Sequence, residues 1–124
     1  GEQIAIMELE ASGDSLEDMA RLAPALQWDH AAELVERAGH CVERIADTEG
    51  SMRSSDRPLS PDFLPMAAET ARRGAIALNK IHGSMPPHGI GRARVSLLTL
   101  ADRLTALREG LFMPASDRRP PDDI

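Results

Sequence analysis

The sequence VSLLTLADRLTALREGLF, residues 95–112, has the clearest helical pattern in the chain. Its leucines recur in alternating steps of three and four residues, at Leu97, Leu100, Leu104, Leu107 and Leu111. We call these five residues the leucine seam, because this spacing places them in one stripe along an α-helix. Burying a leucine side chain stabilises a protein by about 1.5–3 kcal/mol, so the seam should pack inside a bundle or against a second copy of the chain. We therefore predict a helix over residues 92–112.

Residues 26–47 show the same periodicity and form a second predicted helix. Its apolar face includes the residues that we call the tryptophan seam, Trp28, Val35, Val42 and Ile45. Gly39 lies in this segment, and since glycine costs a helix about 1 kcal/mol relative to alanine, we expect close packing there. A third helix is predicted to start after its cap Asp62 and to run over residues 63–81, with a stripe of small residues that lets a neighbouring helix approach closely.

The N-terminal residues are open to two interpretations. Residues 2–11 alternate as a short strand would, but they could equally form a helical arm, and the chain offers no second convincing strand for pairing. The sequence SGD at residues 12–14 is expected to end this segment. A shorter helix should then begin at Ser15 and end or kink at Pro24. We predict an N-terminal arm over residues 1–14.

The remaining segments lack apolar periodicity. Residues 48–60 are predicted to be a flexible linker and residues 82–91 a turn, because glycine, proline and serine interrupt them. The polar, proline-rich residues 114–124 are predicted to be a disordered tail. The expected architecture is an all-α helical bundle domain over residues 15–113, with three long helices and a shorter N-terminal one. The narrow apolar seams, the long linker and the core poor in aromatic residues favour a homodimer, and the pattern does not separate a closed monomeric bundle from an intertwined dimer.

Length and composition limit the classes of function. A chain of 124 residues suffices for one domain, and a single cysteine excludes an internal disulfide framework. No apolar run approaches the roughly 18–20 residues of a membrane span, and no signal peptide is visible, so we expect a cytoplasmic protein without a membrane partner. The basic residues are thirteen arginines and one lysine. That ratio indicates a GC-rich bacterial genome or, alternatively, anion recognition by arginine.

Charge is unevenly distributed along the chain. Residues 1–50 hold twelve acidic and three basic residues, whereas residues 51–124 hold eight acidic and eleven basic ones. The two halves should therefore attract each other within the fold or across an interface. An acidic balance with 2% aromatic residues also argues against nucleic-acid binding, because few side chains could stack on bases.

The residues that could carry catalysis or bind a metal form no recognised motif. The sequence contains no Gly-x-Ser-x-Gly elbow and no Glu-x-x-His motif. Cys41 belongs to the apolar face of residues 26–47, where a free cysteine behaves as a small core hydrophobe. Glu36 and His40, four residues apart, are expected to be a surface pair and not metal ligands. We predict no enzymatic activity, no metal site and no cofactor.

A glycine-rich basic segment precedes the last predicted helix. The sequence GIGR at residues 89–92 lies close to further basic residues, and the basic set is Lys80, His82, His88, Arg92 and Arg94. A glycine-rich turn at a helix N-terminus can bind an anion. The simpler interpretation is a connecting turn whose charges lie in water.

The segment NKIHGS, residues 79–84, is followed by Gly89 and a leucine-rich helix. In this respect it resembles histidine phosphotransfer domains, which are helical bundles of about this size. In that resemblance Asn79 stands at the phosphoacceptor position and His82 at the position of a lysine. The resemblance implies a signalling partner, but asparagine cannot carry the phosphate.

Together these features predict a protein-interaction module. It would bind a partner protein through an apolar helical surface, as adaptors, secretion chaperones and antiactivators do. The leucine seam is the first candidate for that surface or for a homodimer interface, the tryptophan seam is the second, and Arg92 and Arg94 could steer an acidic partner. The alternative is a degenerate histidine-phosphotransfer-like signalling domain, or an anion-responsive regulator, centred on residues 79–94.

Overall fold

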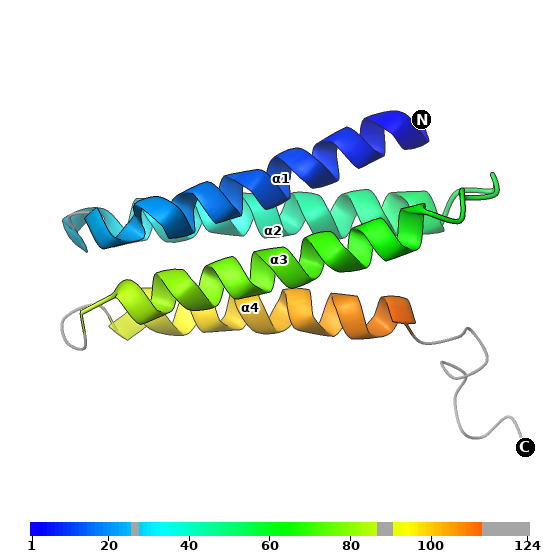
Figure 1. Cartoon of the computed structure of the whole chain (residues 1–124). Coiled ribbons are helices and arrows are strands. Elements are labelled where there is room, and N and C mark those ends of the chain that lie inside the picture. The colour runs from blue at the N-terminus through cyan, green and yellow to red at the C-terminus, as the bar shows by residue number, and fades with distance from the viewer. Residues whose placement is uncertain (26–27, 87–90, 113–124) are drawn as a thin grey trace, which may run out of the picture.

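The chain folds into a bundle of four long helices (Figure 1). The computed structural model describes residues 1–25, 28–86 and 91–112, and these ranges contain no β-strand. The long helices are α1 (Glu2–Leu22), α2 (Ala31–Arg53), α3 (Phe63–Ser84) and α4 (Gly91–Phe112), with the short 3-10 helices η1 (Ala23–Ala25) and η2 (Trp28–His30) between the first two. The all-α helical bundle predicted from the sequence is confirmed.

The four helices are arranged as two antiparallel hairpins that pack side by side (Figure 1). α1 packs against α2 and α3, and α4 packs against α3 and α2, so α2 and α3 touch only weakly across the diagonal. α1 and α3 therefore run parallel to each other, as do α2 and α4 (Figure 1). The segment of residues 54–62 joins the two hairpins, and it connects helices that are diagonal neighbours.

The expected end of the N-terminal segment at residues 12–14 is wrong. α1 is one helix of 21 residues that runs through Gly13, so the N-terminal helix is about as long as the others. The strand interpretation of residues 2–11 is excluded by the same observation. Gly13 is buried, and a Cβ atom at this position would lie 3.2 Å from Cγ2 of Thr70 on α3. Packing against α3 therefore outweighs the low helix propensity of this short stretch.

The predicted linker begins later than expected. α2 continues to Arg53, because Thr48 and Glu49 are buried and bonded. The Thr48 hydroxyl donates a hydrogen bond to Glu8 Oε2 of α1 at 3.2 Å, and Arg53 donates one to Glu49 Oε1 at 3.0 Å. Residues 48–53 are thus helical, whereas the predicted tail at 114–124 lies outside the described residues.

The helix starts of the second hairpin agree closely with the prediction. Asp62 occupies the N-cap position of α3, although its side chain makes no capping hydrogen bond. Pro65 then lies in the first turn, where its missing N–H has no intrahelical partner to lose. α4 begins at Gly91, one residue before the predicted start.

Small residues of α3 let the helices meet closely, as the sequence predicted. Gly74 is buried, and a Cβ atom there would lie 2.7 Å from Leu104 Cδ1 and 3.1 Å from Leu16 Cδ1. Leucines from α4 and α1 therefore meet over this glycine. The core of the described residues is built mainly of alanine and leucine, with Phe63 as its largest fully buried side chain.

Ion pairs link the two hairpins on both sides. Arg73 of α3 pairs with Glu17 of α1 and, at 3.0 Å, with Asp14, while Arg103 of α4 pairs with Glu43 of α2. The hydrogen bond from Arg103 lowers the pKa of the Glu43 carboxyl below its ordinary value. Each pair joins parallel helices, so the acidic first hairpin and the basic second hairpin attract each other as the charge distribution predicted.

None of the helices in the described ranges is both long enough and apolar enough to span a membrane.

Candidate functional site

The leucine seam is divided between core and surface. Leu97 and Leu104 are fully buried in a single chain, and Leu111 is 8% exposed. Leu100 and Leu107 are half-buried. The first three leucines pack inside the bundle, so the expectation that they form a free binding surface is wrong for this fold. Periodicity alone could not show this, because a core stripe and a partner stripe have the same spacing.

The tryptophan seam is divided in the same way. Val42 and Ile45 are fully buried, so they too belong to the core and not to a surface. Trp28 and Val35, at the other end of the seam, are half-buried. These two side chains border an open groove.

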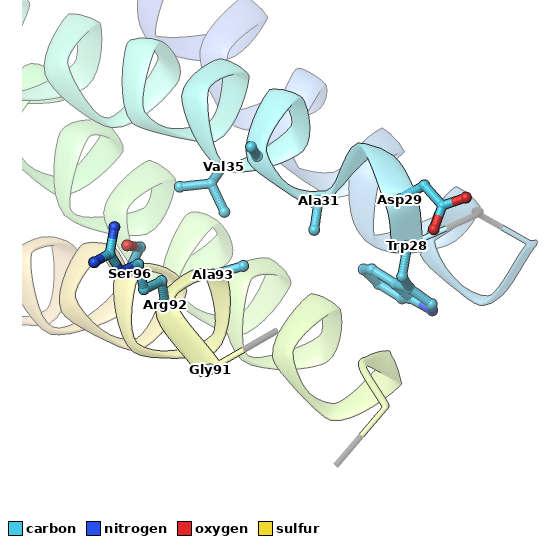
Figure 2. A pocket seen from close by; sticks show the side chains of 9 residues that line it. Trp28, Asp29, Ala31, Val35, Gly91, Arg92, Ala93 and Ser96 are labelled. Atoms are coloured by element: carbon cyan, nitrogen blue, oxygen red, sulfur yellow. The ribbon is translucent and has the colours of Figure 1, made fainter. Parts of the chain in front are cut away.

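This groove lies between the N-terminal ends of α2 and α4, and we call it the α2–α4 groove (Figure 2). Its volume is about 610 Å³, within the range of roughly 300–1,000 Å³ that is common for ligand pockets. The lining residues are Trp28, Asp29, Ala31, Ala32 and Val35 from η2 and α2, and Gly91, Arg92, Ala93 and Ser96 from α4. The side chains of the two helices thus face one another across an open space.

The groove exists because the facing side chains are small. Ala31 and Ala32 of α2 lie opposite Ala93 and Ser96 of α4. These side chains are too short to fill the space between the two helices. Near the middle of the bundle, by contrast, Arg103 reaches across from α4 to Glu43. Ala32, Ala93 and Ser96 are not among the residues predicted from the sequence. No signal in the sequence marks them, because small residues form a groove only once two helices are placed side by side.

Gly39 shows that this side of α2 is open beyond the groove as well. It lies four residues after Val35, and therefore on the same side of the helix. A Cβ atom added at Gly39 would meet no described atom within 4 Å outside its own helix. The expectation of close packing at Gly39 is therefore wrong within a single chain.

The rim of the groove carries opposite charges. Asp29 belongs to the η2 turn before α2, and Arg92 to the first turn of α4, and both are exposed. Charges on a rim fix the orientation of a partner more than they add to its affinity. Arg92, expected to steer a partner, thus lies where it could do so.

The described members of the basic set predicted around the last turn do not gather at one hollow. Lys80 lines a hollow with Arg73 and Glu17, on the α1 side of α3, whereas Arg92 lines the α2–α4 groove. Arg94 donates a hydrogen bond to the carbonyl oxygen of Pro86 at 3.1 Å. This bond holds the first turn of α4 against the residues that follow α3.

The remaining two residues of the predicted basic set are His82 and His88. His82 is half-buried on α3. His88 and residues 87–90 lie outside the described residues.

The candidate reactive and metal-binding side chains are dispersed. Cys41 is half-buried on α2, and burial raises the pKa of its thiol, so the thiol is protonated at neutral pH. Glu36 and His40 are exposed, in agreement with the prediction of surface positions. The described part of the chain holds no cluster of three or more His, Cys, Asp or Glu residues that could bind a metal ion.

The geometry of the groove is therefore the basis for a functional assignment. Comparisons of the chain with protein family models, with curated proteins and with solved structures gave no match.

Proposed function

We propose that the chain is a non-enzymatic protein-interaction module that takes an apolar helix of a partner protein into the α2–α4 groove. The observation that carries the proposal is the groove itself, an open space with apolar side chains on its walls, charged groups on its rim and the single tryptophan of the chain at its border. Amphipathic helices bind in grooves of this kind by inserting side chains at helical spacing.

Three features of the groove support this function. Part of the Trp28 side chain packs against the core and part of it is accessible to a partner. Tryptophan is among the residues that most often dominate binding energy. Ala31, Ala32 and Ala93 leave room for larger apolar side chains from outside. Asp29 and Arg92 then supply the polar rim that surrounds such a contact.

The composition of the chain suggests the organism and the compartment in which we propose that it acts. A bacterial, cytoplasmic regulator of the adaptor, chaperone or antiactivator type would use such a groove, and the single cysteine and the preference for arginine agree with that setting.

A second copy of the chain is the other partner to consider, because the half-buried Leu100 and Leu107 continue along α4 beyond the groove. Native mass spectrometry separates the two cases. If the parent protein is a dimer and the Ala93→Arg variant is a monomer, the groove is a homodimer interface. If the parent protein is a monomer, the groove is free to bind a different protein.

The phosphotransfer-like or anion-responsive alternative receives less support. Its basic residues are distributed over different sides of the bundle, with Lys80 near α1 and Arg92 near α2. Asn79 is exposed on α3, but asparagine cannot be the phosphoacceptor. The groove remains the better candidate because its lining residues converge.

Variants on two sides of α4 test the proposal. Ala93→Arg places a long charged side chain in the groove, whereas Val95→Arg places the same side chain at a position that is 65% exposed and outside the groove lining. We expect quantitative co-purification from the source cells to show a protein that Ala93→Arg loses and Val95→Arg retains. Thermal unfolding of both variants checks that the fold is intact. Equal retention by both variants would contradict the proposal.

A further inference from the structure

A second apolar surface lies on α1, away from the α2–α4 groove. Ile4 and Met7 are 61% and 66% exposed, and the exposed Ala11 follows four residues later. Residues spaced in this way are neighbours on one face of a helix. We call these three residues the α1 patch.

The fold does not require large apolar side chains in the α1 patch. α1 contributes to the core through Ala5, Leu9 and Leu16, which are all buried and lie on its other side. Ile4 and Met7 therefore expose apolar area that polar residues could replace without loss of core packing. Adjacent exposed apolar residues of this kind are more informative than a single one, because they can form a contact surface.

The α1 patch borders a hollow that continues it onto α2. This hollow has a volume of about 340 Å³, and its apolar lining includes Ile4, Ala5 and Met52. The carboxylates of Glu8 and Asp47 line the same hollow. The hydrogen bond from the Thr48 hydroxyl holds the Glu8 carboxylate in place at 3.2 Å.

Acidic residues surround the α1 patch. Glu8 lies four residues after Ile4, and Glu10 lies three residues after Met7, so both are immediate neighbours on the helix surface. Residues 1–20 contain six acidic residues and no lysine, arginine or histidine. Three of these six are paired with arginines, since Asp14 and Glu17 contact Arg73 and Asp18 contacts Arg21. The negative charge beside the apolar patch therefore comes from Glu8, Glu10 and Asp47.

This combination selects the chemistry of the occupant. We propose that the α1 patch docks a basic amphipathic helix of a partner protein, with its apolar ridge on Ile4 and Met7 and its lysines or arginines facing Glu8, Glu10 and Asp47. A second copy docked through the same patch would bring two acidic surfaces together, which is unfavourable. An anionic membrane surface would be repelled for the same reason.

A designed peptide tests the proposal. The probe is a fluorescently labelled amphipathic helix of leucine and lysine, and its leucine–glutamate counterpart is the charge control. We measure binding to the whole protein by fluorescence anisotropy at several salt concentrations. We expect the lysine peptide to bind, the glutamate peptide not to bind, and the affinity to fall as salt rises.

Matched variants locate the binding. Ile4→Gln and Met7→Gln should each weaken binding by about tenfold, since each removes most of the free energy of burying one large apolar side chain. Val95→Gln, at a position 65% exposed on α4, should leave the affinity unchanged. Glu8→Gln should weaken binding and reduce its dependence on salt.

Other results would overturn the proposal. Equal affinities for Met7→Gln, Val95→Gln and the parent protein would show that the peptide binds elsewhere. Self-association that Met7→Gln abolishes in the absence of peptide would identify a second copy as the occupant. Because Ala93→Arg changes only the α2–α4 groove, its effect on co-purification and the effect of Met7→Gln on peptide binding are separate outcomes.

Discussion

At the scale of single residues, two glycines on different helices of the bundle have opposite surroundings. Gly74 is covered by Leu104 and Leu16, whereas Gly39 faces open space. Gly74→Ala must displace a buried leucine methyl group, and overpacking of this kind costs about 1–3 kcal/mol. Gly39→Ala adds helix propensity without a clash and should raise the free energy of unfolding by about 0.5–1 kcal/mol.

Urea denaturation of the two variants checks this prediction. We expect the midpoint to fall for Gly74→Ala and to rise for Gly39→Ala. A rise for both variants would mean that α3 and α4 are farther apart than the structure shows. A fall for Gly39→Ala would mean that another molecule, such as a second copy, packs on this side of α2 in solution.

Cys41 gives a second prediction at this scale. Burial is the main cause that raises the pKa of its thiol, and it outweighs the nearby Arg44 and Arg37, which act in the opposite direction. Since the thiolate is the reactive form, a disulfide reagent should modify Cys41 more slowly at neutral pH than it modifies cysteine dissolved in water. The rate should rise steeply as the pH becomes alkaline. Rapid labelling at neutral pH would contradict the half-buried position of Cys41.

At the scale of helices, the leucine seam distinguishes a core from a surface. Leu104 is fully buried, so Leu104→Ala should lower the free energy of unfolding by about 2–5 kcal/mol. Leu100 is half-buried on the same helix, so Leu100→Ala should cost clearly less. Thermal and urea unfolding measure both. Similar losses for the two variants would indicate that Leu100 is also covered, for example by a partner copy.

The helices themselves could largely be predicted from apolar periodicity. The last helix was predicted to within one residue, because its leucines mark both the face and the extent of the helix. α1 could not be predicted as one helix, because Gly13 favours a turn locally and only its packing against Thr70 explains the helix. The extension of α2 likewise depends on the contact of Thr48 with Glu8, which is 40 residues away in the sequence.

The candidate site was predictable in part. Trp28, Val35 and Arg92 were selected from the sequence, and all three line the α2–α4 groove. Ala93 and Ser96 could not be selected, because a groove is made by missing side-chain volume, and this becomes visible only when the two helices are placed side by side. The exposure of Ile4 and Met7 likewise became visible only once the packed face of α1 was known.

At the scale of the whole molecule, charge helps to hold the two hairpins together. Arg103 of the basic hairpin lowers the pKa of Glu43 in the acidic hairpin below its ordinary value of 4.5, chiefly through a hydrogen bond. The folded state therefore binds a proton at Glu43 less readily than the unfolded state does. The stabilisation is present above about pH 4.5 and is lost as the pH falls through the lowered pKa.

Glu43→Gln tests this linkage. The variant should be less stable than the parent protein at neutral pH, and the difference should shrink as the pH falls below 4.5 and through the lowered pKa, where the parent carboxyl also becomes protonated. Urea midpoints across this range measure the difference. A difference that is independent of pH would show that the charge of Glu43 does not stabilise the α2–α4 contact.

Site-specific photo-crosslinking tests most directly whether the α2–α4 groove binds a partner. A photoreactive residue replaces Ala32, which is exposed in the groove, and in a control protein it replaces Ile76, which is 41% exposed on α3. We predict one discrete adduct, with a partner protein or with a second copy, that forms from position 32, is absent from position 76 and disappears when Ala93 is changed to Arg. No adduct from position 32, or the same adduct from both positions, would contradict the proposal that the α2–α4 groove binds a partner.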